Sequence, residues 1–164
     1  MSDHALDVSM TINGERVAER VEPRKTLVDF LRDDLGLTGS HVGCEHGVCG
    51  ACTMRVDGAI VRGCLMLAVQ CEGAQVETIE GLSDSGEIAD LQAAFEARNA
   101  LQCGYCTPGM IAAAQDLLKR AEETKSVPSR DDIREHLSGN YCRCTGYHAI
   151  VDAVEAVALA RAGK

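Results

Sequence analysis

Hydrophobic and polar positions in the first part of the chain fall into short segments of strand length. Residues 6–12 and 15–21 form two such segments, and the pair Asn13-Gly14 joins them. An Asn-Gly pair readily supplies the two positive φ angles of a tight type I′ turn. The pattern therefore predicts a β-hairpin at the start of the chain.

A short helix and three more strands are predicted after this hairpin. Residues 26–29 read Thr-Leu-Val-Asp, which resembles a helix capping box ahead of two apolar residues. The pair Asp-Gly at 57–58 predicts a second hairpin between strands 54–56 and 59–61, and 75–79 is a last strand. Several strands with one helix indicate a small α+β domain.

The apolar spacing becomes helical in the last part of the chain. Four helices are predicted, over residues 88–95, 107–120, 129–137 and 145–161. In the second helix Thr107 is the expected N-cap, because the proline that follows it suits the first helical position. Four short helices indicate a small bundle.

A polar stretch at residues 81–86 separates the two kinds of pattern and is expected to be a linker. We therefore divide the chain into an α+β domain over 1–82 and a four-helix-bundle domain over 83–164. The whole chain has 164 residues, which is short for a redox enzyme that carries its own substrate pocket.

Composition and charge narrow the possible partners. The net charge is -9 and aromatic residues are only 3% of the chain, which disfavours nucleic acid and direct contact with an anionic membrane. There is no apolar run long enough to span a bilayer and no signal-peptide pattern near the N-terminus, so a cytoplasmic location is expected. Nine cysteines in such a chain indicate metal binding more than disulfides.

The first cysteine group has the spacing of a plant-type [2Fe-2S] site. Its members are Cys44, Cys49, Cys52 and, farther along, Cys64. Neighbouring glycines would let the loop curl around a compact anionic cluster. Four-cysteine zinc is the alternative, but zinc sites usually show two C-x2-C pairs. The spacing favours iron and sulfur.

The second cysteine group is ambiguous from spacing alone. It consists of Cys103, Cys106, Cys142 and Cys144, which could hold zinc, hold a second [2Fe-2S] cluster or act as a dithiol. Helices expected to begin at Thr107 and Thr145 would direct two positive helix N-termini at this group, which favours an anionic centre.

The remaining candidate residues are interpreted as structural. Cys71 continues an apolar run and is expected to be a small buried side chain. His41, His46 and His148 lie near the cysteines, but each group already has four thiols, so we interpret them as non-ligands. No catalytic triad, phosphate loop or dinucleotide motif is present in the sequence.

With both cysteine groups in view, the sequence resembles the small iron-sulfur subunit of the molybdenum hydroxylases, the xanthine dehydrogenase family that includes carbon monoxide dehydrogenase. The resemblance covers nearly the whole chain, and its motifs are residues 43–53, 102–109 and 139–146. It implies an N-terminal β-grasp domain of the plant-type ferredoxin kind and a helical domain, each with one [2Fe-2S] cluster. It also favours iron over zinc in the second group.

The resemblance further implies a role for individual residues. The outer cluster would be held by Cys44, Cys49, Cys52 and Cys64, and the inner cluster by Cys103, Cys106, Cys142 and Cys144. Gln102 would hydrogen-bond a molybdopterin carried by a separate large subunit, and Cys144 would also lie against that pterin.

The expected function is electron transfer from molybdenum through both clusters toward FAD on a medium subunit or another acceptor, with no substrate chemistry on this chain. Relatives imply a dimer of heterotrimers. Two alternatives remain: a free ferredoxin-like shuttle that docks on several enzymes, and a zinc-stabilised interaction module.

Overall fold

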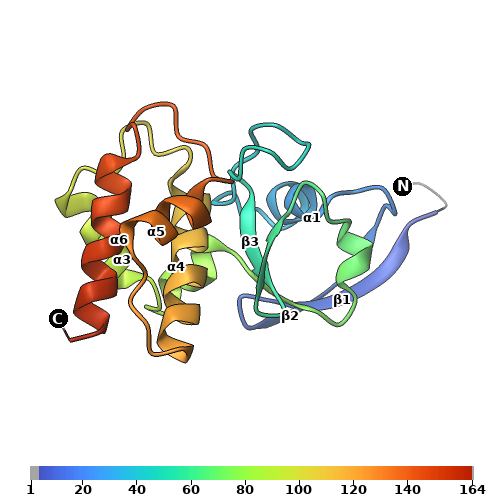
Figure 1. Ribbon diagram of the computed structural model, residues 1–164. Coiled ribbons are helices and arrows are strands. Elements are labelled where there is room, and N and C mark those ends of the chain that lie inside the picture. Colours follow the sequence, from blue (N-terminus) through green and yellow to red (C-terminus); the bar gives the residue numbers. More distant parts are fainter. Residues whose placement is uncertain (1–3, 164) are drawn as a thin grey trace.

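The computed structural model describes residues 4–163 and shows a sheet lobe and a helical lobe side by side. The N-terminal end lies at the far side of the sheet lobe, and the C-terminal end lies at the far side of the helical lobe (Figure 1). None of the helices within residues 4–163 has the length and apolar character needed to cross a bilayer.

The sheet lobe contains a five-stranded mixed sheet with the strand order β2-β1-β5-β3-β4. Both hairpin predictions are confirmed: Asn13 and Gly14 take φ angles of 51° and 86°, and Asp57 and Gly58 take 48° and 82°. The strands are β1 (Leu6–Ile12), β2 (Glu15–Val21), β3 (Thr53–Val56), β4 (Ala59–Arg62) and β5 (Gln75–Glu77).

The short helix α1 (Leu27–Asp29) continues into a π-helical segment over Phe30–Asp34 and packs on the sheet. The predicted cap is confirmed, because the Asp29 N–H donates to the Thr26 side chain at 3.2 Å. Leu27, Phe30 and Met54 are at most 1% exposed and lie in the core of this lobe.

The expected linker at 81–86 is largely helical instead. Helix α2 (Ile79–Asp84) begins directly after β5, and Leu82 is buried in the hydrophobic core of the helical lobe. The polar composition of the stretch reflects its outer face, since only Leu82 among its residues is buried.

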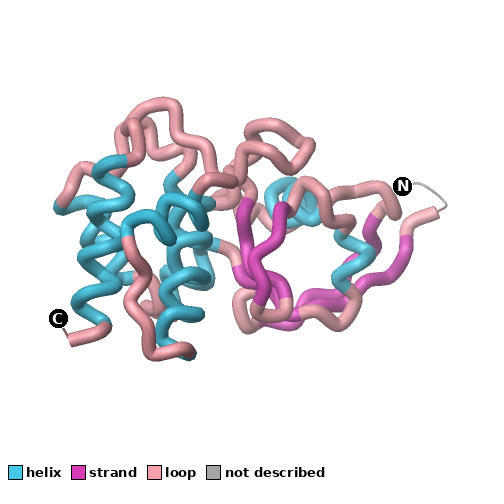
Figure 2. The backbone as a smooth tube through the Cα atoms, in the orientation of Figure 1, coloured by secondary structure: helices cyan, strands magenta, loops and turns pink. Residues whose placement is uncertain are grey.

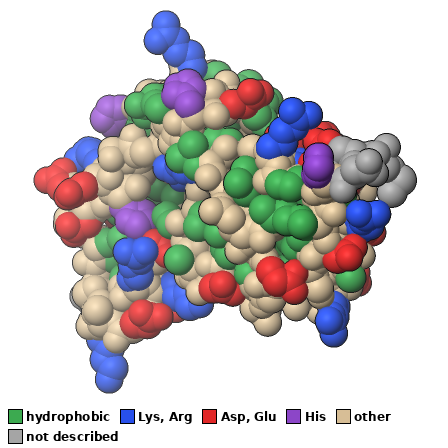
Figure 3. Space-filling view, turned by 90° about the vertical axis from the view of Figure 1, so that its right-hand side faces the viewer, with side chains coloured by type: hydrophobic (Ala, Val, Ile, Leu, Met, Phe, Trp, Pro, Cys, Tyr) green, Lys and Arg blue, Asp and Glu red, His purple; other side chains and the backbone are tan. Residues whose placement is uncertain are grey.

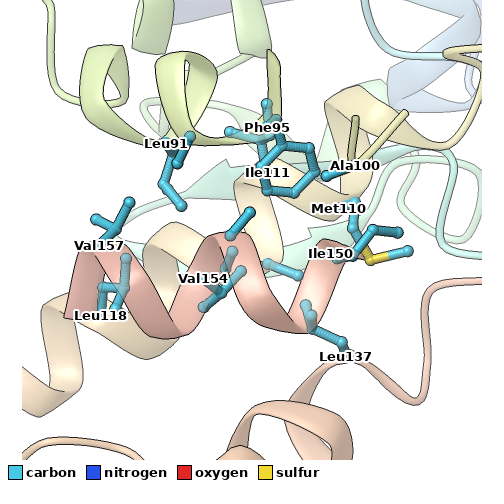
Figure 4. Packing of buried hydrophobic residues seen from close by; sticks show 14 of the residues in the cluster. Leu91, Phe95, Ala100, Met110, Ile111, Leu118, Leu137, Ile150, Val154 and Val157 are labelled. Atoms are coloured by element: carbon cyan, nitrogen blue, oxygen red, sulfur yellow. The ribbon is translucent and has the colours of Figure 1, made fainter. Parts of the chain in front are cut away.

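The helical lobe is built from four longer helices around one core. They are α3 (Ala89–Ala97), α4 (Thr107–Glu123), α5 (Arg130–Leu137) and α6 (His148–Arg161). Figure 4 shows Phe95, Met110, Ile150 and Val154 meeting in this core. The predicted helical bundle is confirmed.

The predicted start of α4 at residue 107 is confirmed, but one predicted N-cap and one other predicted helix start are wrong. Cys106, not Thr107, is the N-cap residue of α4, and the Thr107 hydroxyl forms no capping bond. Helix α6 begins at His148 and not at Thr145, because Gly146 and Tyr147 take left-handed φ angles of 66° and 70° that interrupt the helix. The cap at Ser129 is confirmed as a capping box with Asp132.

A buried arginine ties the two lobes together away from the cysteines. Arg55 of β3 is 7% exposed and donates to both oxygens of Glu77 and both oxygens of Glu87, at 2.6–2.7 Å. Glu87 lies between α2 and α3, and it also accepts from Gln115 of α4 at 2.9 Å. The pair Arg55–Glu87 therefore joins the sheet to the helices.

Candidate metal centres

The first cysteine group lies on a loop that is shaped by left-handed residues. Glu45, Gly47 and Gly50 take φ angles of 57°, 81° and 75°, which turn the chain back on itself between Cys44 and Cys49. This loop, residues 43–50, has no regular secondary structure and lies where the loops of both lobes gather (Figure 2).

The β3–β4 hairpin explains how the distant fourth cysteine joins the others. Cys52 precedes β3 and Cys64 follows β4, and Thr53 pairs with Arg62 in the antiparallel register. The Gly63 N–H donates to the Cys52 carbonyl at 3.1 Å, so the two cysteines are neighbours across the hairpin. Both side chains are buried.

The four thiols of this group meet as two pairs. Cys44 pairs with Cys49, and the Cys49 N–H donates to the Cys44 sulfur at 3.4 Å. This hydrogen bond is the main reason why the pKa of Cys44 is lowered to about 6. Cys64 pairs with Cys52: burial, followed by the neighbouring Cys52 thiol, raises the pKa of Cys64 to about 11. The loop thus stabilises a thiolate at one pair and crowds two thiols at the other.

The second group shows the same paired arrangement on the helical lobe. The sulfurs of Cys103 and Cys144 are 3.5 Å apart, although the two residues come from different loops. Cys106 pairs with Cys142, and burial together with that neighbour raises the pKa of Cys106 to about 12. Although burial opposes it, hydrogen bonds from the Thr145 hydroxyl and N–H lower the pKa of Cys142.

This arrangement provides the donor set of a binuclear cluster. A [2Fe-2S] cluster takes two cysteines on each iron, so two thiol pairs per group are the required donor set. Iron would also keep thiols that crowd each other deprotonated. The Thr107 hydroxyl, next to Cys106, is buried without a partner.

Gln102 lies beside the exposed pair of the second group. Its side-chain amide donates to the Cys144 carbonyl at 3.1 Å, and Gln102, Cys103 and Cys144 are all exposed. The large side chains Leu101 and Tyr141 are exposed nearby in the sequence, at 40% and 54%. Gln102 and the Cys103–Cys144 pair thus share one open surface, whereas Cys106 and Cys142 are half-buried against the core of the helical lobe.

The residues interpreted as structural have other partners. His41 Nδ1 lies 2.8 Å from the Tyr105 carbonyl and its ring stacks on Tyr105, while His46 Nδ1 contacts the Cys44 carbonyl. His148 begins α6 and is exposed. Cys71 is completely buried, as predicted, in the core of the sheet lobe.

The sequence interpretation missed the residues that join the two cysteine groups. The Tyr141 N–H donates to the Cys49 carbonyl at 2.8 Å, and the adjacent Asn140 side chain bonds to backbone of both lobes. A polar residue close to Cys142 was visible in the sequence. Its partners, 31 and 90 residues away, had no local signal.

The face of the sheet lobe that Figure 3 shows has no continuous basic patch among its described residues. Figure 3, which looks at the sheet lobe end-on, shows Lys and Arg interspersed with acidic residues and with exposed hydrophobic side chains. Leu65 is 63% exposed and packs against the loop of residues 43–50. The contact is so close that a Cβ on Gly47 would lie 2.3 Å from the Leu65 side chain.

Comparison with known protein families assigns each lobe separately. Residues 10–83 match the 2Fe-2S iron-sulfur cluster binding domain, and residues 78–155 match the [2Fe-2S] binding domain. The two matches correspond to the sheet lobe with the first cysteine group and the helical lobe with the second.

Similar proteins are subunits or parts of oxidoreductases. The chain is 50% identical over 157 residues to caffeine dehydrogenase subunit gamma from Pseudomonas sp. (strain CBB1), covering 96% of this chain and 92% of that protein. It superposes on a chain of quinoline 2-oxidoreductase from Pseudomonas putida 86 with a TM-score of 0.88 and 51% identity, covering 98% and 96% of the two chains.

A longer relative contains the same unit as one part. The chain aligns with aldehyde oxidoreductase from Desulfovibrio gigas with a TM-score of 0.84 and 41% identity. The alignment covers 96% of this chain but only 17% of that one.

Proposed function

This chain belongs to the small [2Fe-2S] subunits of the molybdenum hydroxylases, and from that membership we propose the ligands, the partners and the direction of electron flow. It is an electron-transfer subunit of an oxidoreductase complex and has two [2Fe-2S] binding domains. When bound, such clusters accept and release single electrons at potentials that the surrounding protein sets.

The paired thiols carry the ligand assignment. The outer cluster would be held by the pairs Cys44–Cys49 and Cys52–Cys64, with one pair on each iron. The inner cluster would be held in the same way by Cys103–Cys144 and Cys106–Cys142. The two expected domains, over 1–82 and 83–164, would then carry one cluster each. Because α2 spans the expected boundary and Leu82 packs in the helical core, we propose that α2 belongs to the second domain.

The open surface of the second group supports contact with a large subunit. Cys103, Cys144 and Gln102 are exposed on one side of the helical lobe, whereas Cys52 and Cys64 are buried in the sheet lobe. In our proposal Gln102 and Cys144 contact the molybdopterin of that subunit. With the clusters bound, electrons would enter at the exposed inner pair and leave from the sheet lobe toward FAD on a medium subunit.

The assembly would be a dimer of heterotrimers in the cytoplasm. A free ferredoxin-like shuttle needs only the sheet lobe and its cluster, so the exposed inner pair with Gln102 favours a permanent partner. Copurification of the large subunit through a tag on this chain tests this point. Recovery of the chain alone from cells that express all subunits would support the shuttle.

Three cysteine variants test the ligand assignment. Cys106→Ser should remove the inner cluster and Cys64→Ser the outer one, so that iron falls from about four to about two atoms per chain in each. Cys71→Ser is the matched control, because Cys71 belongs to neither group and should leave the iron content unchanged. Full iron content and both EPR signals in Cys106→Ser would refute the assignment.

A further inference from the structure

The two cysteine groups are joined by a short, tightly packed seam between the lobes. On the sheet side it contains Cys49, Gly50 and Thr53, and on the helical side it contains Gly109 and residues 139–142. The Tyr141 N–H donates to the Cys49 carbonyl at 2.8 Å, and Tyr141 is covalently followed by Cys142. One hydrogen bond therefore completes an otherwise covalent connection from an outer-group cysteine to an inner-group cysteine.

Asn140 holds this hydrogen bond in place. It is 2% exposed, and its side-chain amide donates to the Gly50 carbonyl at 3.0 Å and to the Gly109 carbonyl at 2.9 Å. The same amide lies 3.2 Å from the Thr53 hydroxyl. Asn140 thus fixes both ends of the Cys49–Tyr141 hydrogen bond, since it precedes Tyr141 in the chain and binds the Gly50 carbonyl next to Cys49.

Glycines allow the close approach of the two backbones. A Cβ on Gly50 would lie 2.6 Å from the Gly139 carbonyl oxygen, and a Cβ on Gly109 would lie 2.2 Å from the Gly50 carbonyl oxygen. Both distances are too short for any side chain, so the seam requires glycine on both sides.

Arg62 supports the seam from the hairpin that carries Cys64. Its guanidinium donates to the Gly139 carbonyl at 2.8 Å, to the Asn140 side chain at 3.3 Å and to the Thr53 hydroxyl. These acceptors are all uncharged. The arginine therefore orients Asn140 and adds a positive charge between two groups that would be anionic when loaded.

We propose that the connection Cys49 C=O···H–N Tyr141–Cys142 is the route of the single electron that passes between the two clusters, and that Asn140 is the positioning residue of this route. With both clusters bound, the inner centre would give up one electron and the outer centre would accept it, with no atom or proton transferred. Substrate oxidation in the complex would supply the electron. The inference rests on the proposed ligand sets.

A second contact between the loops provides a rival route. The Tyr105 hydroxyl donates to the Val42 carbonyl at 2.7 Å, and Tyr105 lies between Cys103 and Cys106 in sequence. From Val42 the chain passes through one more residue before it reaches Cys44, so this route is longer on the sheet-lobe side than the route through Cys49. Tyr105→Phe removes this hydrogen bond and leaves the Cys49–Tyr141 bond in place.

The test uses the intact complex with Asn140→Ala, Tyr105→Phe and a control, Glu87→Gln. The control weakens the same lobe interface at the Arg55 contact, away from the seam. After rapid injection of one electron by pulse radiolysis, optical and freeze-quench EPR signals follow its redistribution between the clusters. Redox titration checks that both potentials are unchanged, and hydrogen exchange of a peptide covering 138–146 reports opening of the seam.

In Asn140→Ala we expect exchange in the peptide covering 138–146 to be about tenfold faster, because the buried hydrogen bonds of the Asn140 side chain to the Gly50 and Gly109 carbonyls are lost. We also expect slower redistribution at unchanged potentials, while Glu87→Gln and Tyr105→Phe keep the rate of the unaltered complex. If Asn140→Ala loses iron, Arg62→Met, which loosens Asn140 without removing its amide, takes its place.

Three results would overturn the proposal. The first is an unchanged rate in Asn140→Ala despite faster exchange. The second is equal slowing in Glu87→Gln, which would indicate a general effect of the interface, and the third is slowing in Tyr105→Phe alone. Failure of the ligand assignment looks different, since the unaltered complex would then lack one of the two EPR signals.

Discussion

The Arg55–Glu87 contact offers the clearest energetic prediction. Glu87→Gln removes the charge of Glu87 but keeps its size, and its amide nitrogen cannot accept a hydrogen bond. Of the four charge-assisted bonds of Arg55, only the two with Glu77 remain, and the glutamine oxygen can accept only a weaker, neutral bond. The side chain of Glu87 is 29% exposed and that of Arg55 is 8% exposed, so the pair is only partly screened by water.

The size of the effect follows from the pKa of Glu87. Hydrogen bonds from Arg55 lower it from 4.5 to about 2. At 1.36 kcal/mol per pKa unit this corresponds to roughly 3 kcal/mol, and the partial exposure of Glu87 reduces it to about 2 kcal/mol. For a chain of this length the loss should lower the melting temperature by about 4–8 °C.

Thermal unfolding at neutral pH, followed by circular dichroism, measures this loss. Arg55→Met and the double variant complete a thermodynamic cycle, in which the two changes should couple by about 2 kcal/mol. Because the pKa of Glu87 is lowered by folding, its contribution is complete above the unfolded value of 4.5 and declines as the pH falls toward 2. The difference in unfolding free energy between the unaltered protein and Glu87→Gln should therefore be constant from about pH 5.5 to 8. A difference below 0.5 kcal/mol, or one that varies across this range, would refute the reasoning.

Three further variants test separate parts of the structure. Gly50→Ala should lower the iron content of the purified protein, because Gly50 has a φ of 75° and an alanine Cβ would clash with the Gly139 carbonyl. A normal iron content would contradict the requirement for glycine in the seam. Cys71→Ala should cost about 1 kcal/mol in chemical unfolding through a small cavity while both EPR signals persist, and loss of a signal would make Cys71 part of a site. Ser129→Ala removes the N-cap of α5 and should cost about 1 kcal/mol; no change in the melting temperature would contradict the capping role.

Local signals explain why much of the fold could be predicted. The Asn13-Gly14 and Asp57-Gly58 turns fix their hairpins by backbone conformation alone, and β1 and β2 have the predicted bounds. The helical periodicity likewise locates α3, α5 and α6, because each buries one apolar face in a common core, whereas α4 is buried over consecutive residues 109–116. Cysteine spacing located both groups for the same reason: most ligands are close neighbours in sequence.

Long-range packing explains the errors. Residues 81–86 look like a linker because of their polar outer face, and only the contact of Leu82 with the helical core reveals α2. Thr107 has the sequence of an N-cap, but Cys106 occupies that position. Asn140 acts through carbonyls on two other segments, so no window of sequence around it could indicate its role.

Metal analysis of the purified protein together with low-temperature EPR tests whether both cysteine groups hold [2Fe-2S] clusters. Two clusters predict about four iron atoms per chain, no stoichiometric zinc and, after dithionite reduction, two distinguishable S = 1/2 signals. About two iron atoms with one zinc would restrict electron transfer to the sheet lobe and make the helical group structural. Zinc alone, with no signal, would show that neither group holds an iron-sulfur cluster.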